Sequence, residues 1–338
     1  MAGGWRSSGC RAVTVLLTGA AGFIGFHTAL ALLARGERVV GLDCINDYYD
    51  VRLKEARLAL LGEQKGFTFH RVDIADRAAV SAVMAAHPEV TAVVHLAAQA
   101  GVRFSMIDPY AYVASNVMGH VVMLEAARGL RGIQHFVYAS SSSVYGANSK
   151  MPFAETDRVD TPLSLYAATK RADELMSYAY AHLYGIPQTG LRFFTVYGAW
   201  GRPDMAYFSF ADSIMAGRPI TLYDGGALRR DFTYIDDIVG GVLGCLDRPP
   251  LSEEGQRVLN IGNNLSESVS TLVDLLEQSL GRKAIRVSAP RPAADVLETC
   301  ADVDAIGALA GFSPSTPLSV GIPRFSSWFK GWRGKTFI

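Results

Sequence analysis

A tyrosine and a lysine four residues apart have the residue types and the spacing for acid–base chemistry. Tyr166 and Lys170 stand in the stretch Ser164-Leu-Tyr-Ala-Ala-Thr-Lys170, and this separation puts both side chains on one face of a helix. A lysine ammonium near a phenol lowers the pKa of the phenol, because it favours the charged form. Such a phenol can exchange a proton with a sugar or alcohol hydroxyl near neutral pH. The pair alone is a weak signal, because an ordinary amphipathic helix also carries Tyr and Lys at this spacing.

Four consecutive serines, Ser140 to Ser143, precede this pair. They follow Gln134–Ala139, an apolar run that predicts a buried strand. Ligands of open α/β sheets bind at the carboxyl ends of the strands, so the serine hydroxyls are placed to bind a substrate there. Turn formation at a strand end is the alternative explanation for such a run. It applies more to Ser140 than to Ser141.

The segment near the N-terminus predicts a dinucleotide-binding unit. Val13–Leu17 is a β-branched and aliphatic run typical of a buried parallel strand, and it leads into Thr18-Gly-Ala-Ala-Gly-Phe-Ile-Gly25 and an apolar helix. In this pattern Gly19 permits a tight turn, Gly22 lets the backbone approach a pyrophosphate and Gly25 lets the helix pack closely on the strand. The amide groups at the start of the helix then bind the phosphates.

Acidic residues end the next two strands. Asp43 closes the strand Arg38–Asp43, where a carboxylate accepts hydrogen bonds from an adenosine ribose. Its charge disfavours a 2′-phosphate, so the sequence predicts NAD in preference to NADP; a solvated loop acid is the less favoured explanation. Asp73 is expected to meet the adenine, and the strand Ala92–Gln99 runs into small residues that suit close approach of a dinucleotide.

Further strand and helix patterns predict an α/β fold. Long helices are expected over Pro109–Arg128 and Ser164–Tyr184, and a strand over Gln188–Phe194. The regular alternation then breaks, and the chain returns to the sheet near Val258–Gly262 before a helix near Thr271–Leu280. We therefore predict a doubly wound parallel sheet, a Rossmann fold, with a smaller interleaved C-terminal lobe.

The same pattern predicts how the chain is divided. Residues 1–190, with a return segment at about 232–262, form the NAD-binding domain in this prediction. Residues 191–231 and 263–338 form the substrate-binding lobe.

Composition excludes several classes of protein. The 338 residues include 32 basic and 32 acidic side chains, which gives no basic surplus for nucleic acid or an anionic membrane. The four cysteines are scattered, without CxxC or His at metal spacing, and predict reduced thiols rather than disulfides or a metal site; they are Cys10, Cys44, Cys245 and Cys300. No apolar run is long enough to span a bilayer, so we expect a cytoplasmic protein.

Several motifs in a fixed order resemble the extended short-chain dehydrogenase/reductase family of nucleotide-sugar enzymes. They are TGAAGFIG, the acid at Asp43, HLAAQAGVR, YASSSSVYG, SLYAATK and RRDFTYIDD. The resemblance runs from about Val13 to Trp328. Within this family, longer stretches are similar to the UDP-glucuronate 4-epimerases; these are Asn46–Asp50, Leu191–Gly198 and Trp200–Ala206.

The resemblance implies an isomerase that uses bound NAD to convert UDP-glucuronate to UDP-galacturonate for polysaccharide biosynthesis. A hydride leaves C4, the 4-keto sugar rotates, and the hydride returns to its other face. The resemblance also implies a homodimer, formed through the helices near Pro109–Arg128 and Ser164–Tyr184.

Roles for individual residues follow from the same resemblance. Tyr166 is the base, Lys170 binds the nicotinamide ribose, and Ser141 hydrogen-bonds the sugar O4. The residues expected to bind the cofactor are Gly19, Gly22, Phe23, Ile24, Gly25, Asp43, Asp73, Ile74, Leu96, Ala97, Ala98, Tyr166, Lys170 and Phe193. Those expected to bind the UDP-sugar are Arg103, Ser141, Ser142, Ser143, Thr195, Arg202, Arg230 and Asp295.

A glucuronate substrate makes a special demand. Oxidation at C4 gives a β-keto acid, which loses carbon dioxide when its C5–carboxylate bond aligns with the C4 carbonyl π system. An epimerase must hold the carboxylate out of that alignment, and the planar fork of Arg202, with Thr195, matches the family positions for this role. A surface loop arginine is the alternative explanation.

Four other functions are weighed against this one. Related 4,6-dehydratases carry an Asp-Glu pair at the positions of Ser142 and Ser143. Related UDP-glucuronate decarboxylases commonly carry a glutamate there. In this chain both residues are serines, whose side chains carry only hydroxyls. An epimerase of a neutral UDP-hexose would not need Arg202 and Thr195. A catalytically silent NAD-binding scaffold would not need Tyr166 together with its lysine and serine partners.

One stretch departs from the family pattern. Where relatives have a Gln-Pro-Gly-Asp-Val-Pro-Glu-Thr-like run, this chain has Arg291-Pro-Ala-Ala-Asp-Val-Leu-Glu-Thr299. Alanine at Ala294 and the loss of proline at Leu297 put the local turn in doubt. Asp295 is still expected at the uridine ribose, and Arg291 is a candidate diphosphate contact.

Overall fold

The computed structural model describes residues 13–251, 255–292 and 295–336. Cys10 and Ala294, which enter two of the predictions above, lie outside these ranges. Within them, Cys44, Cys245 and Cys300 are free thiols. None of the described helices combines the length and the apolar character that crossing a bilayer requires.

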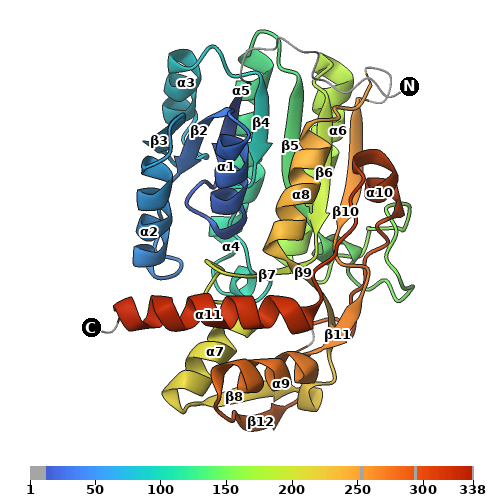
Figure 1. Cartoon of the computed structure of the whole chain (residues 1–338). Coiled ribbons are helices and arrows are strands. Elements are labelled where there is room, and N and C mark those ends of the chain that lie inside the picture. Colours follow the sequence, from blue (N-terminus) through green and yellow to red (C-terminus); the bar gives the residue numbers. More distant parts are fainter. Residues whose placement is uncertain (1–12, 252–254, 293–294, 337–338) are drawn as a thin grey trace.

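A parallel sheet of seven strands is the largest element of the described chain (Figure 1), in the order β10-β6-β5-β4-β1-β2-β3. Every neighbouring pair in it is parallel. The strand order reverses between β1 and β4, which is where doubly wound sheets bind ligands. The strands are β1 (Thr14–Thr18), β2 (Arg38–Asp43), β3 (Phe67–Arg71), β4 (Ala92–His95), β5 (His135–Ser141), β6 (Gln188–Phe193) and β10 (Gln256–Ile261).

Helices cover both faces of this sheet, as its alternating side chains require. Val15 and Leu17 pack with α1 (Phe23–Ala34), α2 (Val51–Gly62) and α8 (Ile235–Leu246) on one face. Leu16, between them, packs on the other face with α3 (Arg77–Ala86) and α5 (Gly119–Gly129), beside α6 (Leu165–Tyr184). The predicted α/β fold with a doubly wound parallel sheet is confirmed.

The predicted long helix over Pro109–Arg128 is interrupted. It consists of α4 (Pro109–Tyr112), a π-helical segment (Val113–Met118) and α5. Asn116 lies in the π-helical segment and is buried; its side chain accepts a hydrogen bond from the Gln99 amide (2.8 Å) and donates to the Thr169 hydroxyl (3.0 Å). Asn116 thus joins this segment to the residues after β4 and to α6, and π-helical turns are frequent at functional sites.

The rest of the chain lies below the carboxyl ends of the large sheet (Figure 1). Short strands pair in two small sheets: β9 (Arg229–Tyr234) lies between β7 (Thr195–Tyr197) and β11 (Ser266–Ser268), and β8 (Pro219–Tyr223) pairs with β12 (Ile285–Ala289). The helices of this region are α7 (Ala206–Ala216), α9 (Val269–Leu280) and α11 (Leu318–Thr336), whereas α10 (Asp304–Ala310) lies beside β10 (Figure 1).

Candidate active site

A cavity of about 440 Å³ opens at the carboxyl ends of the parallel strands. One side of it is formed by the glycine-rich turn after β1 and by the residues that follow β2 and β4. The other side is formed by the serines at the end of β5, the start of α6 and the loop after β7. The cavity therefore spans the point where the strand order reverses.

The glycine-rich turn leaves no room for side chains. A Cβ atom on Gly25 would lie 2.0 Å from the Gly19 carbonyl oxygen, and one on Gly22 would lie 2.9 Å from the same atom. Gly19 itself has φ +73°, a backbone conformation that favours glycine. Gly22 is the N-cap of α1 and cannot cap it with a side chain, so the first amide groups of the helix are available to a phosphate.

Asp43 is fixed in the same wall. Its Oδ2 accepts a hydrogen bond from the Ala21 amide (3.1 Å) and its Oδ1 accepts one from the Ile45 amide (2.8 Å). Both bonds leave lone pairs free for ribose hydroxyls. Every other residue expected to bind the cofactor also lines the cavity, from Phe23 and Asp73 to Ala98 and Phe193. The residues of this wall thus fit a dinucleotide.

Tyr166 and Lys170 lie in the first turns of α6, which begins where predicted. Ser164 caps this helix by accepting a hydrogen bond from the Ala167 amide (3.1 Å). Lys170 is buried, and its ammonium donates to the Ala139 carbonyl (2.9 Å) and to Asp173 Oδ2 (3.1 Å). These bonds hold the lysine beside the cavity that Tyr166 also lines.

The serine run is part strand and part turn. β5 continues through Ser141, further than predicted. The Ser140 hydroxyl donates to buried Glu174 (2.6 Å), so it holds β5 to α6. Ser141 Oγ accepts hydrogen bonds from the amide (3.2 Å) and the hydroxyl (2.9 Å) of Ser143. Ser141, Ser142 and Ser143 all line the cavity.

Arg202 lines the cavity and is paired with an acid that the sequence did not single out. Its Nε donates to Asp204 Oδ1 (3.0 Å) and its Nη2 donates to Oδ2 (2.6 Å). The hydroxyl of Tyr48 also donates to Asp204 Oδ2 (3.3 Å). Burial raises the pKa of Asp204, but the Arg202 charge outweighs this and holds it below its usual value. Thr195 lines the same side.

Asp204 and Tyr48 are therefore site residues that the sequence analysis missed. A signal was present, because each stands in one of the stretches that resemble the UDP-glucuronate 4-epimerases. Lys54 was missed as well; it lines the cavity near Asp43, and its ammonium donates to the carbonyl and the side chain of Asn46 (2.7 and 2.6 Å).

Only some of the charged residues expected to bind the UDP-sugar line the cavity. Arg230 and Asp295 line the cavity, whereas Arg103 lies outside its wall and reaches it through an ion pair with Asp295 (2.7 Å). The Arg103 guanidinium also stacks over the Tyr223 ring (4.6 Å). Arg291 does not line the cavity; it bonds to the Asp295 carbonyl and pairs with Asp224 (3.5 Å).

The stretch that departs from the family pattern is joined to β9. The Leu297 carbonyl accepts hydrogen bonds from the Arg229 amide (2.9 Å) and from the Arg230 side chain (3.3 Å). Burial lowers the pKa of Arg230. Among the described residues, no group of three or more His, Cys, Asp or Glu side chains could hold a metal ion.

Comparison with known proteins shows the family of this chain. The profile of the NAD dependent epimerase/dehydratase family matches residues 15–262, most of the chain. The chain belongs to this family. The family predicted from the motifs is thereby confirmed, and the matched region contains the glycine-rich turn, the serine run, the Tyr166–Lys170 pair and Arg202.

Two relatives are similar to this chain over nearly its whole length. A probable UDP-glucuronate 4-epimerase of Rhizobium meliloti (strain 1021) is 47% identical over 331 residues, which are 93% of this chain and 96% of that protein. UDP-glucuronate 4-epimerase 3 of Arabidopsis thaliana is 48% identical over 336 residues, which are 95% of this chain and 77% of that protein.

A solved structure is similar in both sequence and fold. It is the UDP-glucuronic acid 4-epimerase of Bacillus cereus, in complex with UDP-glucuronic acid and NAD. It is 33% identical with a TM-score of 0.88, and the match covers 95% of this chain and 100% of that one.

Proposed function

We propose that this protein is an NAD-dependent 4-epimerase that interconverts UDP-glucuronate and UDP-galacturonate without loss of the carboxylate. The observation that carries the proposal is a single cavity that joins three features. The glycine-rich turn and Asp43 form one side, and the Tyr166–Lys170 pair and Arg202 lie on the other side. The relatives and the solved structure named above support the same substrate and cofactor.

Tyr166 is the group that moves the proton in this proposal. Bound NAD supplies the oxidising power, taking a hydride from C4 of the sugar and later returning it to the opposite face. The Tyr166 phenolate takes the proton of the C4 hydroxyl, and the phenol so formed gives it back after the sugar has rotated. Ser141 hydrogen-bonds the sugar O4, and Lys170, held by the Ala139 carbonyl, orients the nicotinamide ribose.

Arg202 and Thr195 protect the substrate from decarboxylation. The 4-keto sugar is a β-keto acid, so its carboxylate must stay out of line with the C4 carbonyl π system. Only one edge of the Arg202 guanidinium is used by Asp204, and an arginine has five N–H donors. The remaining donors of Arg202 are available to hold the substrate carboxylate in the safe orientation.

The proposal also assigns a binding role to each part of the chain. Residues 1–190, with the return segment at about 232–262, bind NAD, and residues 191–231 and 263–338 bind the nucleotide sugar. Asp295 binds the uridine ribose, and Arg230 contacts the diphosphate. A cytoplasmic location stays a prediction from the lack of a bilayer-spanning run in the sequence, and a role in polysaccharide biosynthesis stays a prediction from the resemblance.

We also propose a homodimer formed by α6 and the segment before α5. Large apolar side chains are exposed on both, with Tyr110 83% and Tyr178 62% exposed. Neighbouring exposed side chains are Met106, Ile107, Val113, Met118, Leu175 and Leu183. Large apolar side chains that are exposed on packed neighbouring elements support an interface rather than a solvated face.

The proposal is tested by giving the purified protein UDP-glucuronate, with UDP-glucose in a parallel reaction and no added NAD. We expect UDP-galacturonate from the first reaction and little turnover of the neutral sugar. A pentose as the main product would favour the decarboxylase, and turnover of UDP-glucose alone would favour a neutral UDP-hexose epimerase. No product even with added NAD would favour a binding protein.

A further inference from the structure

The loop that carries Arg202 has a strained backbone just before it. Trp200 has φ +60°, a left-handed conformation that costs a residue other than glycine of order 1–3 kcal/mol. Such a conformation persists only when the surrounding structure holds it. Arg202 follows two residues later, so whatever holds Trp200 also sets the position of this arginine.

A buried arginine on α2 holds this strained turn. Arg57 is 0% exposed. Its Nη2 donates to the carbonyl oxygens of Trp200 (2.6 Å) and Gly201 (3.1 Å). Its Nη1 donates to the carbonyl of Ala21 in the glycine-rich turn (2.7 Å) and to the hydroxyl of Tyr49 (2.8 Å). One guanidinium thus joins the cofactor side of the cavity to the loop that carries Arg202.

The charge of Arg57 is buried among uncharged hydrogen-bond partners. Within the described ranges none of the ion pairs involves Arg57, and its four hydrogen-bond partners are carbonyls and a hydroxyl. A buried cation without an acidic partner is costly to stability. An uncharged side chain would fill the same space without this cost. The presence of a charged arginine here is therefore explained by the backbone carbonyls that its planar guanidinium holds in place, and not by a gain in stability.

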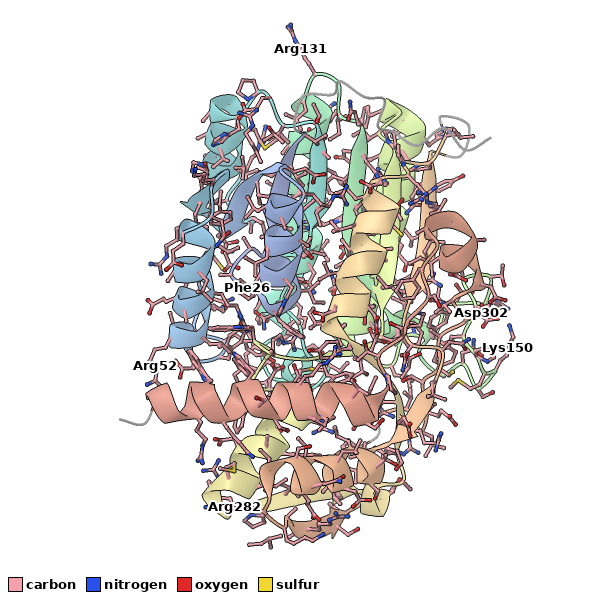
Figure 2. All side chains as sticks on the ribbon, viewed as in Figure 1. Phe26, Arg52, Arg131, Lys150, Arg282 and Asp302 are labelled. Carbon is pink, nitrogen blue, oxygen red and sulfur yellow. The ribbon has the colours of Figure 1, made fainter. Side chains whose placement is uncertain are left out.

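Neighbouring residues hold the same turn from other sides. Burial lowers the pKa of His27 to about 4, so its ring is neutral at pH 7 and donates from Nε2 to the Ala199 carbonyl (3.0 Å). The Trp200 ring packs between Phe26 (5.5 Å between centroids) and two tryptophans of α11, Trp328 (5.3 Å) and Trp332 (5.5 Å). Figure 2 shows Phe26 at the end of α1 that faces α11.

Two more contacts limit the movement of the loop. A Cβ atom on Gly201 would lie 1.7 Å from the Tyr207 hydroxyl, so the chain passes close to this ring. Beyond Arg202, Asp204 is held by the Tyr48 hydroxyl (3.3 Å). Tyr48 stands next to Tyr49, which bonds Arg57. The segment from Tyr48 to Arg57 therefore contacts the loop on both sides of Arg202.

We propose that Arg57 is a positioning residue that fixes the loop so that Arg202 holds the substrate carboxylate away from decarboxylation. This inference rests on the function proposed above. Arg57 is not among the residues that line the cavity; it acts through the carbonyls of Trp200 and Gly201. Because it also bonds Ala21, it ties the position of Arg202 to the turn that binds the cofactor phosphates.

Loss of this contact changes the outcome of the reaction as well as its rate. With Arg202 displaced, the carboxylate of the 4-keto sugar can align with the C4 carbonyl. The C5–carboxylate bond then breaks, its electron pair moves into the C4 carbonyl, carbon dioxide leaves, and C5 takes up a proton. Displacements of about 1 Å at reacting groups can change rates by about 100-fold.

The test compares Arg57→Met and Arg57→Lys with Arg52→Met, a control on the same helix. Arg52 pairs only with Asp50 among the described residues, and Figure 2 shows it on the outer side of α2. Each protein is given UDP-glucuronate, and the ratio of decarboxylated to epimerised sugar is measured. The NAD content and the melting temperature of each protein are measured separately. We expect this ratio to rise at least about 10-fold in Arg57→Met.

The other variants separate positioning from mere folding. Arg57→Lys keeps the charge without the fork, so its ratio should lie between those of Arg57→Met and the unchanged protein. Arg52→Met should leave the ratio unchanged. A folded, NAD-containing Arg57→Met with an unchanged ratio overturns the proposal, even if its rate falls. If Arg57→Met does not fold, an unchanged ratio in Arg57→Lys overturns the proposal. Absence of UDP-galacturonate from the unaltered protein would contradict the proposed function instead.

Discussion

The ammonium of Lys170 lies 3.1 Å from Oδ2 of Asp173, and both side chains are buried. The other oxygen of Asp173 has no hydrogen-bond partner in the described part of the chain. Burial raises the pKa of Asp173 to about 6, and the charge of Lys170 opposes this only in part. The lysine of the site is therefore held by an acid whose charge is lost at mildly acidic pH.

Asp173 should make the stability of the protein fall as the pH rises. Its pKa is raised in the folded state, so its stabilising contribution is complete below pH 3.8, the unfolded value, and is lost as the pH rises to about 6. Relative to Asp173→Asn, the free energy of unfolding of the unaltered protein should fall by about 2–3 kcal/mol between pH 4 and pH 6.5.

Chemical denaturation of both proteins across this pH range measures the effect. Asp160→Asn, at an exposed aspartate, is the control and should follow the unaltered protein. Parallel stability curves for Asp173→Asn and the unaltered protein would contradict the assignment.

Tyr166→Phe should abolish the proton transfer and leave the cofactor site intact. Removal of the one phenolic oxygen should lower kcat by about 1,000-fold. The variant should keep its NAD and its melting temperature, because Phe fills the same place on α6. Tyr178→Phe, on the exposed side of the same helix, should keep full activity. Equal activity of Tyr166→Phe and the unaltered protein would exclude Tyr166 as the base.

Asp43→Asn should weaken cofactor binding. The carboxylate accepts two backbone amides and has lone pairs left for ribose hydroxyls, and hydrogen bonds to a charged group contribute about 1.5–3 kcal/mol. The Kd for NAD, measured by calorimetry on protein stripped of cofactor, should rise about 10- to 100-fold. Asp76→Asn is the matched control, since Asp76 also accepts a backbone amide (3.0 Å) but caps α3 away from the cavity. Equal losses in both variants would point to folding rather than binding.

Much of the dinucleotide unit could be predicted because its signals are local. The strand β2 and the start of α6 lie where hydrophobic patterning and the Ser164 cap place them. Gly19, Gly22 and Gly25 stand where backbone geometry demands glycine. Each of these features depends on residues within a few positions of one another.

Features that depend on distant contacts could not be predicted. The π-helical segment carries Asn116, which bonds Gln99 and Thr169, and neither bond can be read from helical periodicity. Arg57 looks like an ordinary helical arginine until the fold places Trp200 beside it, 143 residues away. The pairing of Arg202 with Asp204 needed side-chain geometry, although both residues stand in one short stretch.

The exposed apolar surface on α6 should be a dimer interface. Leu175→Glu combined with Tyr178→Glu places two charges on it, and a buried unpaired charge is costly. The double variant should be monomeric by sedimentation or light scattering and should keep its secondary structure. Leu251→Glu, at an exposed leucine elsewhere, should leave the assembly unchanged. A monomeric unaltered protein at micromolar concentration would show that this surface has another purpose.

The most direct test of the central claim follows an isotope through the reaction. UDP-glucuronate carrying deuterium at C4 is incubated with the purified protein without added NAD, and the products are resolved by mass and by NMR. Epimerisation at C4 by removal and return of the same hydride predicts UDP-galacturonate that keeps both the deuterium at C4 and the carboxylate. Loss of the deuterium to solvent, or a pentose as the main product, would contradict the account.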